Sequence, residues 1–129
     1  MRRFPLGEHL GFEYFPTPEG YEIEFQPRPE HLNPRGTVHG GVLCDLTDAA
    51  MGLTWMQRVG EDQPFTTIEL KINFLKPVWD SRLRAIARIL KGGRTIALLA
   101  CDVFDQKGSL VAHATSTVMM LSGDAARGR

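Results

Sequence analysis

The sequence predicts an α+β protein in which an antiparallel β-sheet wraps around one long central α-helix. Three observations support this: one proline-free segment with apolar residues at helical spacing, two short alternating segments before it, and four longer alternating segments after it. A sheet buries one face against another layer, and this helix is the only predicted element long enough to provide that layer. The 129 residues, 43% of them hydrophobic, fit a single globular domain over residues 1–129.

The first two predicted strands form a hairpin. Residues 11–15 (GFEYF) and 21–26 (YEIEFQ) alternate between apolar and polar side chains, and the PTPEG between them supplies turn residues. Pro27, Pro29 and Pro34 follow and predict an irregular chain up to Gly36, because proline lacks the backbone N–H that regular structure uses.

Residues 40 to about 58 are the predicted helix. Apolar side chains recur along it at helical spacing: Val42, Leu46, Ala49, Leu53 and Met56. Its other faces are also mostly apolar, which indicates a helix buried in the interior. Gly52 lies in its middle, where glycine costs about 1 kcal/mol relative to alanine. We therefore expect Gly52 to make room for a ligand or for a second backbone.

Four strands are predicted after the helix, at residues 66–74, 81–90, 95–104 and 109–121, paired in sequence order as a meander. In the first of these strands, side chains alternate between the two faces of the sheet. The apolar face is formed by Ile68, Leu70, Ile72 and Phe74, and the polar face by Thr67, Glu69, Lys71 and Asn73. Residues 122–129 have almost no apolar content and are expected to fray. One helix cannot cover six strands, so we expect a homodimer, assembled further as a dimer of dimers.

Charge and composition argue against several functions. Fifteen basic residues balance fifteen acidic ones, so no net positive field favours nucleic acid as a partner. No apolar run is long enough to cross a bilayer and no signal-peptide core is present, which predicts a cytoplasmic protein without a membrane partner. Cys44 and Cys101 lie in apolar surroundings and are predicted to be buried, reduced thiols.

The segment NPRGTVHGGVLCDLTD, residues 33–48, contains the residue types of a catalytic site. Gly40 and Gly41 begin the predicted helix, so their N–H groups lack helical partners and stand at the positive end of the helix dipole. A developing oxyanion is stabilised by such groups. Two carboxylates, Asp45 and Asp48, lie further along the same apolar helix, and a buried carboxylate requires either a partner or a function.

Asn33, the HGG at residues 39–41 and Asp48, together with the order of strands and helix, resemble the hotdog-fold acyl-CoA thioesterases of the phenylacetate-degradation and 4-hydroxybenzoyl-CoA types. The resemblance implies hydrolysis of an acyl-CoA to a free acid and coenzyme A, with Asp48 as nucleophile or general base. It implies that the Gly40 N–H polarises the thioester carbonyl, with Gly41 beside it at the substrate.

The resemblance implies three further roles. Asn33 would position the carboxylate or water, His39 would shape the turn, and Thr67 would come from the neighbouring subunit. Asp45 matches no catalytic position, so we expect it to have a structural partner or to face solvent. Coenzyme A is part of the substrate, and no cofactor or metal is expected.

Several alternatives remain open from the sequence. Five basic residues are expected either to form a solvated sheet face or to hold the phosphates of coenzyme A: Arg82, Arg84, Arg88, Lys91 and Arg94. A zinc site of His39, Cys44 and Asp48 fits no common ligand spacing. The chain could also be a binding module that holds acyl-CoA without turnover. The acyl group could be aromatic, medium-chain or naphthoyl.

Overall fold

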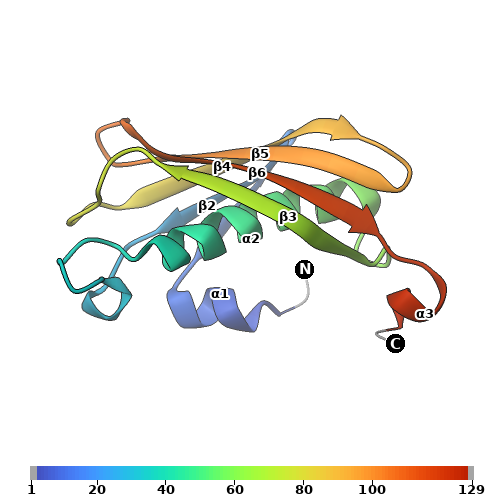
Figure 1. Cartoon of the computed structure of the whole chain (residues 1–129), viewed down its shortest axis with the longest axis horizontal. Helices are drawn as coiled ribbons and strands as arrows, with labels where there is room; N and C mark the ends of the chain where they lie inside the picture. Colours follow the sequence, from blue (N-terminus) through green and yellow to red (C-terminus); the bar gives the residue numbers. More distant parts are fainter. Residues whose placement is uncertain (1–2, 128–129) are drawn as a thin grey trace.

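A computed structural model describes residues 3–127 and shows one curved sheet with a long helix across its concave face (Figure 1). The elements in chain order are α1 (Pro5–Leu10), β1 (Glu13–Thr17), β2 (Gly20–Phe25), a 3-10 turn (Pro29–His31), α2 (Gly40–Val59), β3 (Phe65–Phe74), β4 (Leu83–Gly92), β5 (Ile96–Phe104), β6 (Leu110–Met120) and α3 (Gly123–Ala126). The predicted fold class is confirmed.

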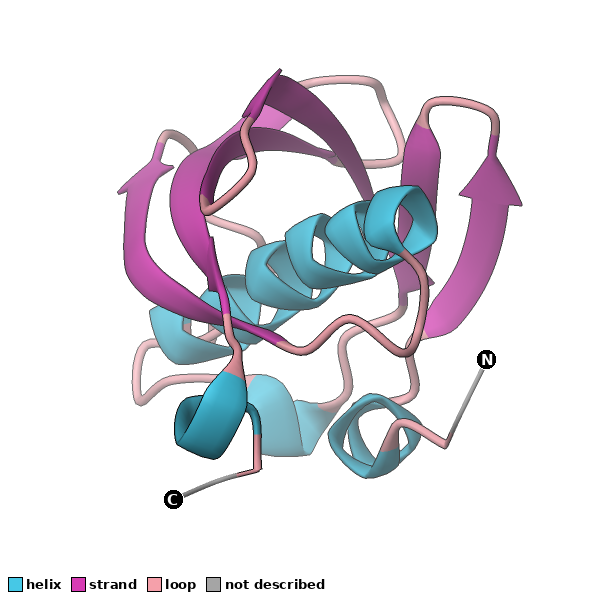
Figure 2. Ribbon diagram, turned by 90° about the vertical axis from the view of Figure 1, so that its right-hand side faces the viewer, coloured by secondary structure: helices cyan, strands magenta, loops and turns pink. Residues whose placement is uncertain are grey.

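Helix α2 forms the centre of the hydrophobic core. In the view turned by 90° from that of Figure 1, the sheet curls around the helix, so strands lie on more than one side of it (Figure 2). Its buried residues include apolar side chains from several faces: Leu43, Leu46, Ala49, Ala50, Met51, Leu53 and Trp55. Inward-facing residues of the strands, such as Ile23, Leu83 and Leu99, complete the core. The prediction of a buried helix from Gly40 to about residue 58 is confirmed.

The sheet order is β1-β2-β4-β5-β6-β3, with all pairs antiparallel. The predicted meander is correct for β4, β5 and β6 but wrong for β3, which pairs with β6 at the edge of the sheet. Residues 75–82 join β3 to β4 and contain Pro77, so they are too long for a tight hairpin. This connection packs instead at the beginning of α2, where the Val38 N–H donates to the Val78 carbonyl at 2.9 Å.

A β-bulge in β3 changes which residues face the helix. Thr67 is opposite Val118 and Glu69 is opposite Thr117, so Ile68 has no counterpart on β6. Val118 is fully buried, and Thr67, its cross-strand partner, points to the same inner side. Ile68 is 52% exposed. The predicted faces are therefore wrong for Thr67 and Ile68, because alternation fails at the extra residue.

Three short helical segments were not predicted from the sequence. Helix α1 has six residues, too few to show a helical period, and lies on the side of α2 away from the sheet (Figure 1). The chain leaves it at Gly11, whose φ of 82° favours glycine. A 3-10 turn interrupts the predicted irregular region. Helix α3 forms within the tail that was expected to fray, and residues 128–129 of that tail lie outside the described residues.

Both cysteines are free thiols, although Cys44 is half-buried while Cys101 is fully buried. Burial is the main cause that raises the pKa of each thiol. Over residues 3–127, none of the helices combines the length and apolar character needed to span a membrane.

Tyr14 packs under α1 in a manner that leaves its hydroxyl buried. The ring lies against Phe4, with ring centroids 5.8 Å apart, and its Oη touches the Gly7 backbone, where a side chain would not fit. The Oη has no hydrogen-bond partner among residues 3–127. Burial, with a smaller effect of Glu8, raises the pKa of Tyr14 to about 12.

We expect Tyr14→Phe to leave the free energy of unfolding unchanged or to raise it by up to about 1 kcal/mol, because it removes a buried hydroxyl that makes no hydrogen bond. Urea denaturation at neutral pH measures this, with Tyr21→Phe as the control. A loss of more than about 1 kcal/mol would show that the Tyr14 hydroxyl does bond to a partner in solution.

Candidate active site

His39 organises the beginning of α2. It is the N-cap residue, and its Nδ1 accepts a hydrogen bond from the Gly41 N–H at 2.9 Å. Its carbonyl accepts from the Val42 N–H at 3.0 Å. The Gly40 N–H, by contrast, has no acceptor within residues 3–127. The structure therefore leaves Gly40 free to donate to a substrate carbonyl, whereas the N–H of Gly41, which was also expected at the substrate, is already used.

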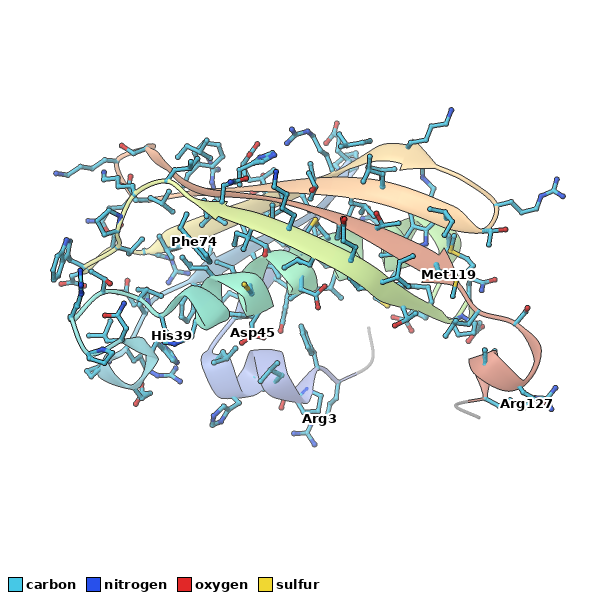
Figure 3. The ribbon with its side chains drawn as sticks, viewed as in Figure 1. Arg3, His39, Asp45, Phe74, Met119 and Arg127 are labelled. Carbon is cyan, nitrogen blue, oxygen red and sulfur yellow. The ribbon has the colours of Figure 1, made fainter. Side chains whose placement is uncertain are left out.

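An aromatic ring lies close against Gly40. A Cβ at position 40 would lie 3.0 Å from Cζ of Phe74, at the end of β3. Phe74 is nevertheless 54% exposed. Figure 3 shows Phe74 and His39 at the same end of the molecule. A cavity of about 390 Å³ is lined here by residues that include Asn33, Gly40 and Phe74.

Asn33 holds the loop before α2 in shape. Its Oδ1 accepts from the N–H groups of Arg35 at 2.9 Å and Thr37 at 3.2 Å. Its Nδ2 donates to Thr37 Oγ1 at 2.8 Å. One Nδ2 hydrogen remains for a ligand, because the amide nitrogen carries two. The turn role is thus clear, and Asn33 also lies in the same cavity as Gly40.

Asp48 and Thr67 form a pair on the open side of α2. The Thr67 hydroxyl donates to Asp48 Oδ1 at 3.1 Å, both residues belonging to the same chain. The expectation that Thr67 serves the neighbouring subunit stays a prediction, and the contact found here lies within one chain. The bulge of β3 is the reason, since it turns Thr67 toward the helix. Among residues 3–127 no cation lies within 4.0 Å of Asp48, which leaves its other oxygen positions for water or substrate.

Asp45, one turn earlier, differs from Asp48. It is half-buried and makes no hydrogen bond or ion pair with any residue between Arg3 and Arg127. Of the two expectations for Asp45, a structural partner is absent from this part of the chain, and the half-buried side chain faces solvent in part. Burial, followed by the nearby charge of Asp48, raises the pKa of Asp45.

A second cavity, of about 600 Å³, opens beside Asp48. Asp48, Thr66, Thr67 and Arg3 supply its polar lining, and the remaining lining is apolar or small: Phe4, Ala49, Gly52, Leu53, Met56 and Phe65. A Cβ at Gly52 would meet no atom within 4 Å. This agrees with the expectation that Gly52 makes room. Phe4 and Phe65 carried no signal in the sequence, since neither belongs to a motif.

The two halves of the expected site are far apart within one chain. Gly40 and Asp48 are eight residues apart on α2, a separation of about 12 Å. An oxyanion donor lies about 3 Å from the reacting oxygen. A catalytic carboxylate must likewise reach the carbonyl carbon or its water at about 3 Å. One chain therefore does not hold both groups around a single thioester.

The basic residues lie elsewhere on the sheet. Arg82 pairs with Glu13 at 2.6 Å and with Glu24 at 3.0 Å. Arg88 pairs with Asp102 at 2.9 Å, and His113 Nδ1 lies 2.6 Å from the same carboxylate.

Arg84, Lys91 and Arg94 are exposed and form no ion pair within residues 3–127. Arg84 points away from α2, because its neighbours Leu83 and Ala85 point inward. Strands β5 and β6 separate β4 from β3. The structure does not bring Arg82, Arg84 or Arg88 to Asp48 in the same chain.

Known proteins are similar to this chain in sequence and in fold. The medium/long-chain acyl-CoA thioesterase YigI of Escherichia coli is 27% identical over 90% of this chain and 85% of that protein. A mutant structure of the phenylacetic acid degradation protein PaaI of Thermus thermophilus is 29% identical, covers 92% of this chain and 100% of its own, and has a TM-score of 0.84. A Bacillus halodurans protein solved with CoA is 28% identical, covers 94% of this chain and 81% of its own, and has a TM-score of 0.87.

The model of the thioesterase superfamily matches residues 35–112, which is more than half of the chain. That match begins two residues after Asn33 and includes the rest of the loop, all of α2 and most of the sheet. Gly40, Asp48 and Thr67 lie within it. Together with the hotdog architecture of its structural neighbours, it identifies the protein as a thioester hydrolase by family. The chain belongs to the thioesterase superfamily.

Proposed function

We propose that the protein hydrolyses acyl-CoA thioesters in a site formed by two copies of the chain. Asp48 of one copy and the Gly40 N–H of the other act on the same thioester. The observation that supports this most strongly concerns residues 3–127: the Gly40 N–H has no acceptor there and Asp48 has only the Thr67 hydroxyl, yet the two groups lie about 12 Å apart within one chain. A second copy provides the missing half of each site.

Hydrolysis of a thioester requires an ionised carboxylate and a hydrogen-bond donor to the carbonyl oxygen. Asp48 either attacks the carbonyl carbon or takes a proton from the water that does, while Thr67 holds one carboxylate oxygen in place. Negative charge then develops on the carbonyl oxygen and is stabilised by the Gly40 N–H, which needs no reorganisation because the helix fixes its direction. If Asp48 activates water, cleavage of the carbon–sulfur bond releases the free acid together with coenzyme A, whose sulfur takes up the proton. If Asp48 attacks the carbonyl itself, the same cleavage releases coenzyme A and leaves an acyl anhydride on Asp48, which water then hydrolyses to the free acid.

The geometry of β3 supports the pairing of two copies. This ten-residue strand is an edge of the sheet, so one row of its N–H and C=O groups lacks a neighbouring strand. Thr67 near its beginning contacts Asp48, and Phe74 at its end lies against Gly40. Antiparallel pairing of β3 with its copy, about a twofold axis between Leu70 and Lys71, sets Phe74 of one chain opposite Thr67 of the other. This pairing brings Gly40 of one chain, which lies against Phe74, close to Asp48 of the other chain.

The nature of the substrate is supported by the relatives. YigI is named as a medium/long-chain acyl-CoA thioesterase, and the Bacillus halodurans neighbour was solved with CoA. Both are similar to this chain over at least 90% of its length. Coenzyme A is accordingly proposed as part of the substrate here.

We expect Asp48→Asn to lower kcat by about 100-fold or more with little change in the melting temperature, because it preserves shape and removes charge and basicity. Thiol release from an acyl-CoA panel, followed with a chromogenic thiol reagent, measures it. Asp45→Asn is the matched control, since it removes a carboxylate one turn away on the same helix. Equal losses in the two variants would show that Asp48 is not the catalytic carboxylate.

Complementation between two inactive variants tests the shared site. Gly40→Pro removes the donor N–H at the first helical residue, where proline is tolerated, and we expect about a 100-fold loss in kcat. Mixed with Asp48→Asn, unfolded and refolded together, it gives heterodimers with one doubly defective site and one intact site. Random mixing should restore about a quarter of the wild-type activity.

The control for this experiment is Gly40→Ala, which keeps the N–H but places a Cβ against Phe74 and so reports the steric effect alone. If both groups served the same chain, every site in a heterodimer would carry one defect. Activity that stays at the level of the two parents, with heterodimers demonstrated by mass spectrometry, would therefore contradict the shared site.

A further inference from the structure

We infer that Gly52 determines which acyl groups the site accepts, and that the cavity beside it takes a straight acyl chain of about ten carbons rather than an aromatic ring. This inference rests on the proposed function, because it assigns the acyl end of the same substrate. The cavity of about 600 Å³ that Asp48 and Thr67 help to line supports it.

The cavity runs along one face of α2, starting at the reacting group. Asp48, Gly52 and Met56 are spaced four residues apart, so they lie on the same side of the helix. Side chains on both sides are apolar: Ala49 and Leu53 from α2, Phe65 from β3 and Phe4 from the N-terminal segment. An acyl chain whose carbonyl carbon is beside Asp48 therefore has an apolar path leading away from it.

Gly52 has no backbone reason to be glycine. Its φ is not positive, and it lies within the regular part of α2, where alanine is the more stable residue. It also avoids no clash, since a Cβ there would meet no atom within 4 Å. This contrasts with Gly40, whose Cβ would press on Phe74. What the glycine does provide is open volume in the middle of the apolar path.

The dimensions favour a chain over a ring. Asp48 and Met56 are eight residues apart, or about 12 Å along the helix. An extended chain of single bonds advances about 3.6 Å over three bonds, so this distance matches about ten bonds. A single aromatic ring placed next to Asp48 would end near Gly52 and leave the apolar surface of Met56 and Phe65 without contact.

The N-terminal segment supplies a fixed part of the wall. Phe4 stacks on Tyr14 with ring centroids 5.8 Å apart, which anchors it to β1. Arg3 beside it is held by Glu8 at 2.8 Å, so its charge is already paired outside the apolar path. Both residues also line the cavity. The wall opposite α2 is thus formed by side chains with contacts of their own.

The test compares butyryl-CoA, decanoyl-CoA and benzoyl-CoA with Gly52→Leu. Leucine fills the middle of the path, so kcat/KM for decanoyl-CoA should fall by about 10-fold to 100-fold, while the value for butyryl-CoA stays within about twofold. Gly52→Ala should lie between, and its melting temperature should rise above that of the wild type because the helix gains an alanine. Arg58→Leu, which places a leucine on α2 outside this cavity, should keep the wild-type ratio.

An unchanged ratio in Gly52→Leu would overturn the inference, as would equal losses on butyryl-CoA and decanoyl-CoA with the fold intact. A wild-type preference for benzoyl-CoA that Gly52→Leu does not affect would also overturn it. If the wild type hydrolyses none of the three, the proposed function fails. Calorimetric titration with decanoate then still tests the cavity, since binding by the wild type that is lost in Gly52→Leu would uphold it and absence of binding would reject it.

Discussion

The structure depends on how helix α2 is fixed in rotation about its own axis. The core sets this rotation through polar contacts as well as through apolar packing. Trp55 Nε1 lies 3.0 Å from Met120 Sδ on β6, and the Tyr21 N–H of β2 donates to Thr54 Oγ1 at 2.9 Å. Because these contacts come from opposite parts of the sheet, the helix cannot turn without leaving buried polar groups unpaired. Asp48 is thereby held on the open side.

The same constraint explains why two glycines on one helix have opposite roles. Gly40 is at the beginning of α2, where Phe74 crosses the backbone closely and the N–H must stay uncovered. Gly52 lies about three turns later, on the open side, where nothing approaches it. Close packing requires the first glycine and empty space requires the second. A helix that is buried on its other faces can carry a site only along such a stripe.

Much of the fold could be predicted from the sequence because it is expressed in local periodicity. The alternating strands and the apolar segment from Gly40 onward define their elements without reference to distant residues. Asp48 and Gly40 were found through a motif whose residues are close in sequence. In contrast, the position of β3 beside β6 depends on pairing between distant segments, which no local pattern encodes.

The parts of the site that sequence reasoning missed have a common cause. Phe74 follows the alternation of β3 and was placed only on the apolar face of that strand, yet it lies over Gly40 and is 54% exposed. Phe4 is the N-cap of α1, a helix of six residues that is too short to recognise. Thr67 and Asp48 were both identified, but their contact within one chain was not, because the bulge cannot be read from a sequence that alternates without interruption. Each of these depends on tertiary contacts.

The bulge at Ile68 also governs how this chain tolerates changes in length. Ile68 is the extra residue, since Thr67 and Glu69 already face two neighbouring residues of β6, Val118 and Thr117. Loss of Ile68 would therefore restore regular pairing and leave Thr67 facing Asp48. Side chains on a strand alternate with a period of two, so loss of a residue between Glu69 and Phe74 would instead turn the residues on one side of the gap to the opposite face. Position 68 is thus a place in β3 where the length of the chain can change without turning Thr67 away from Asp48.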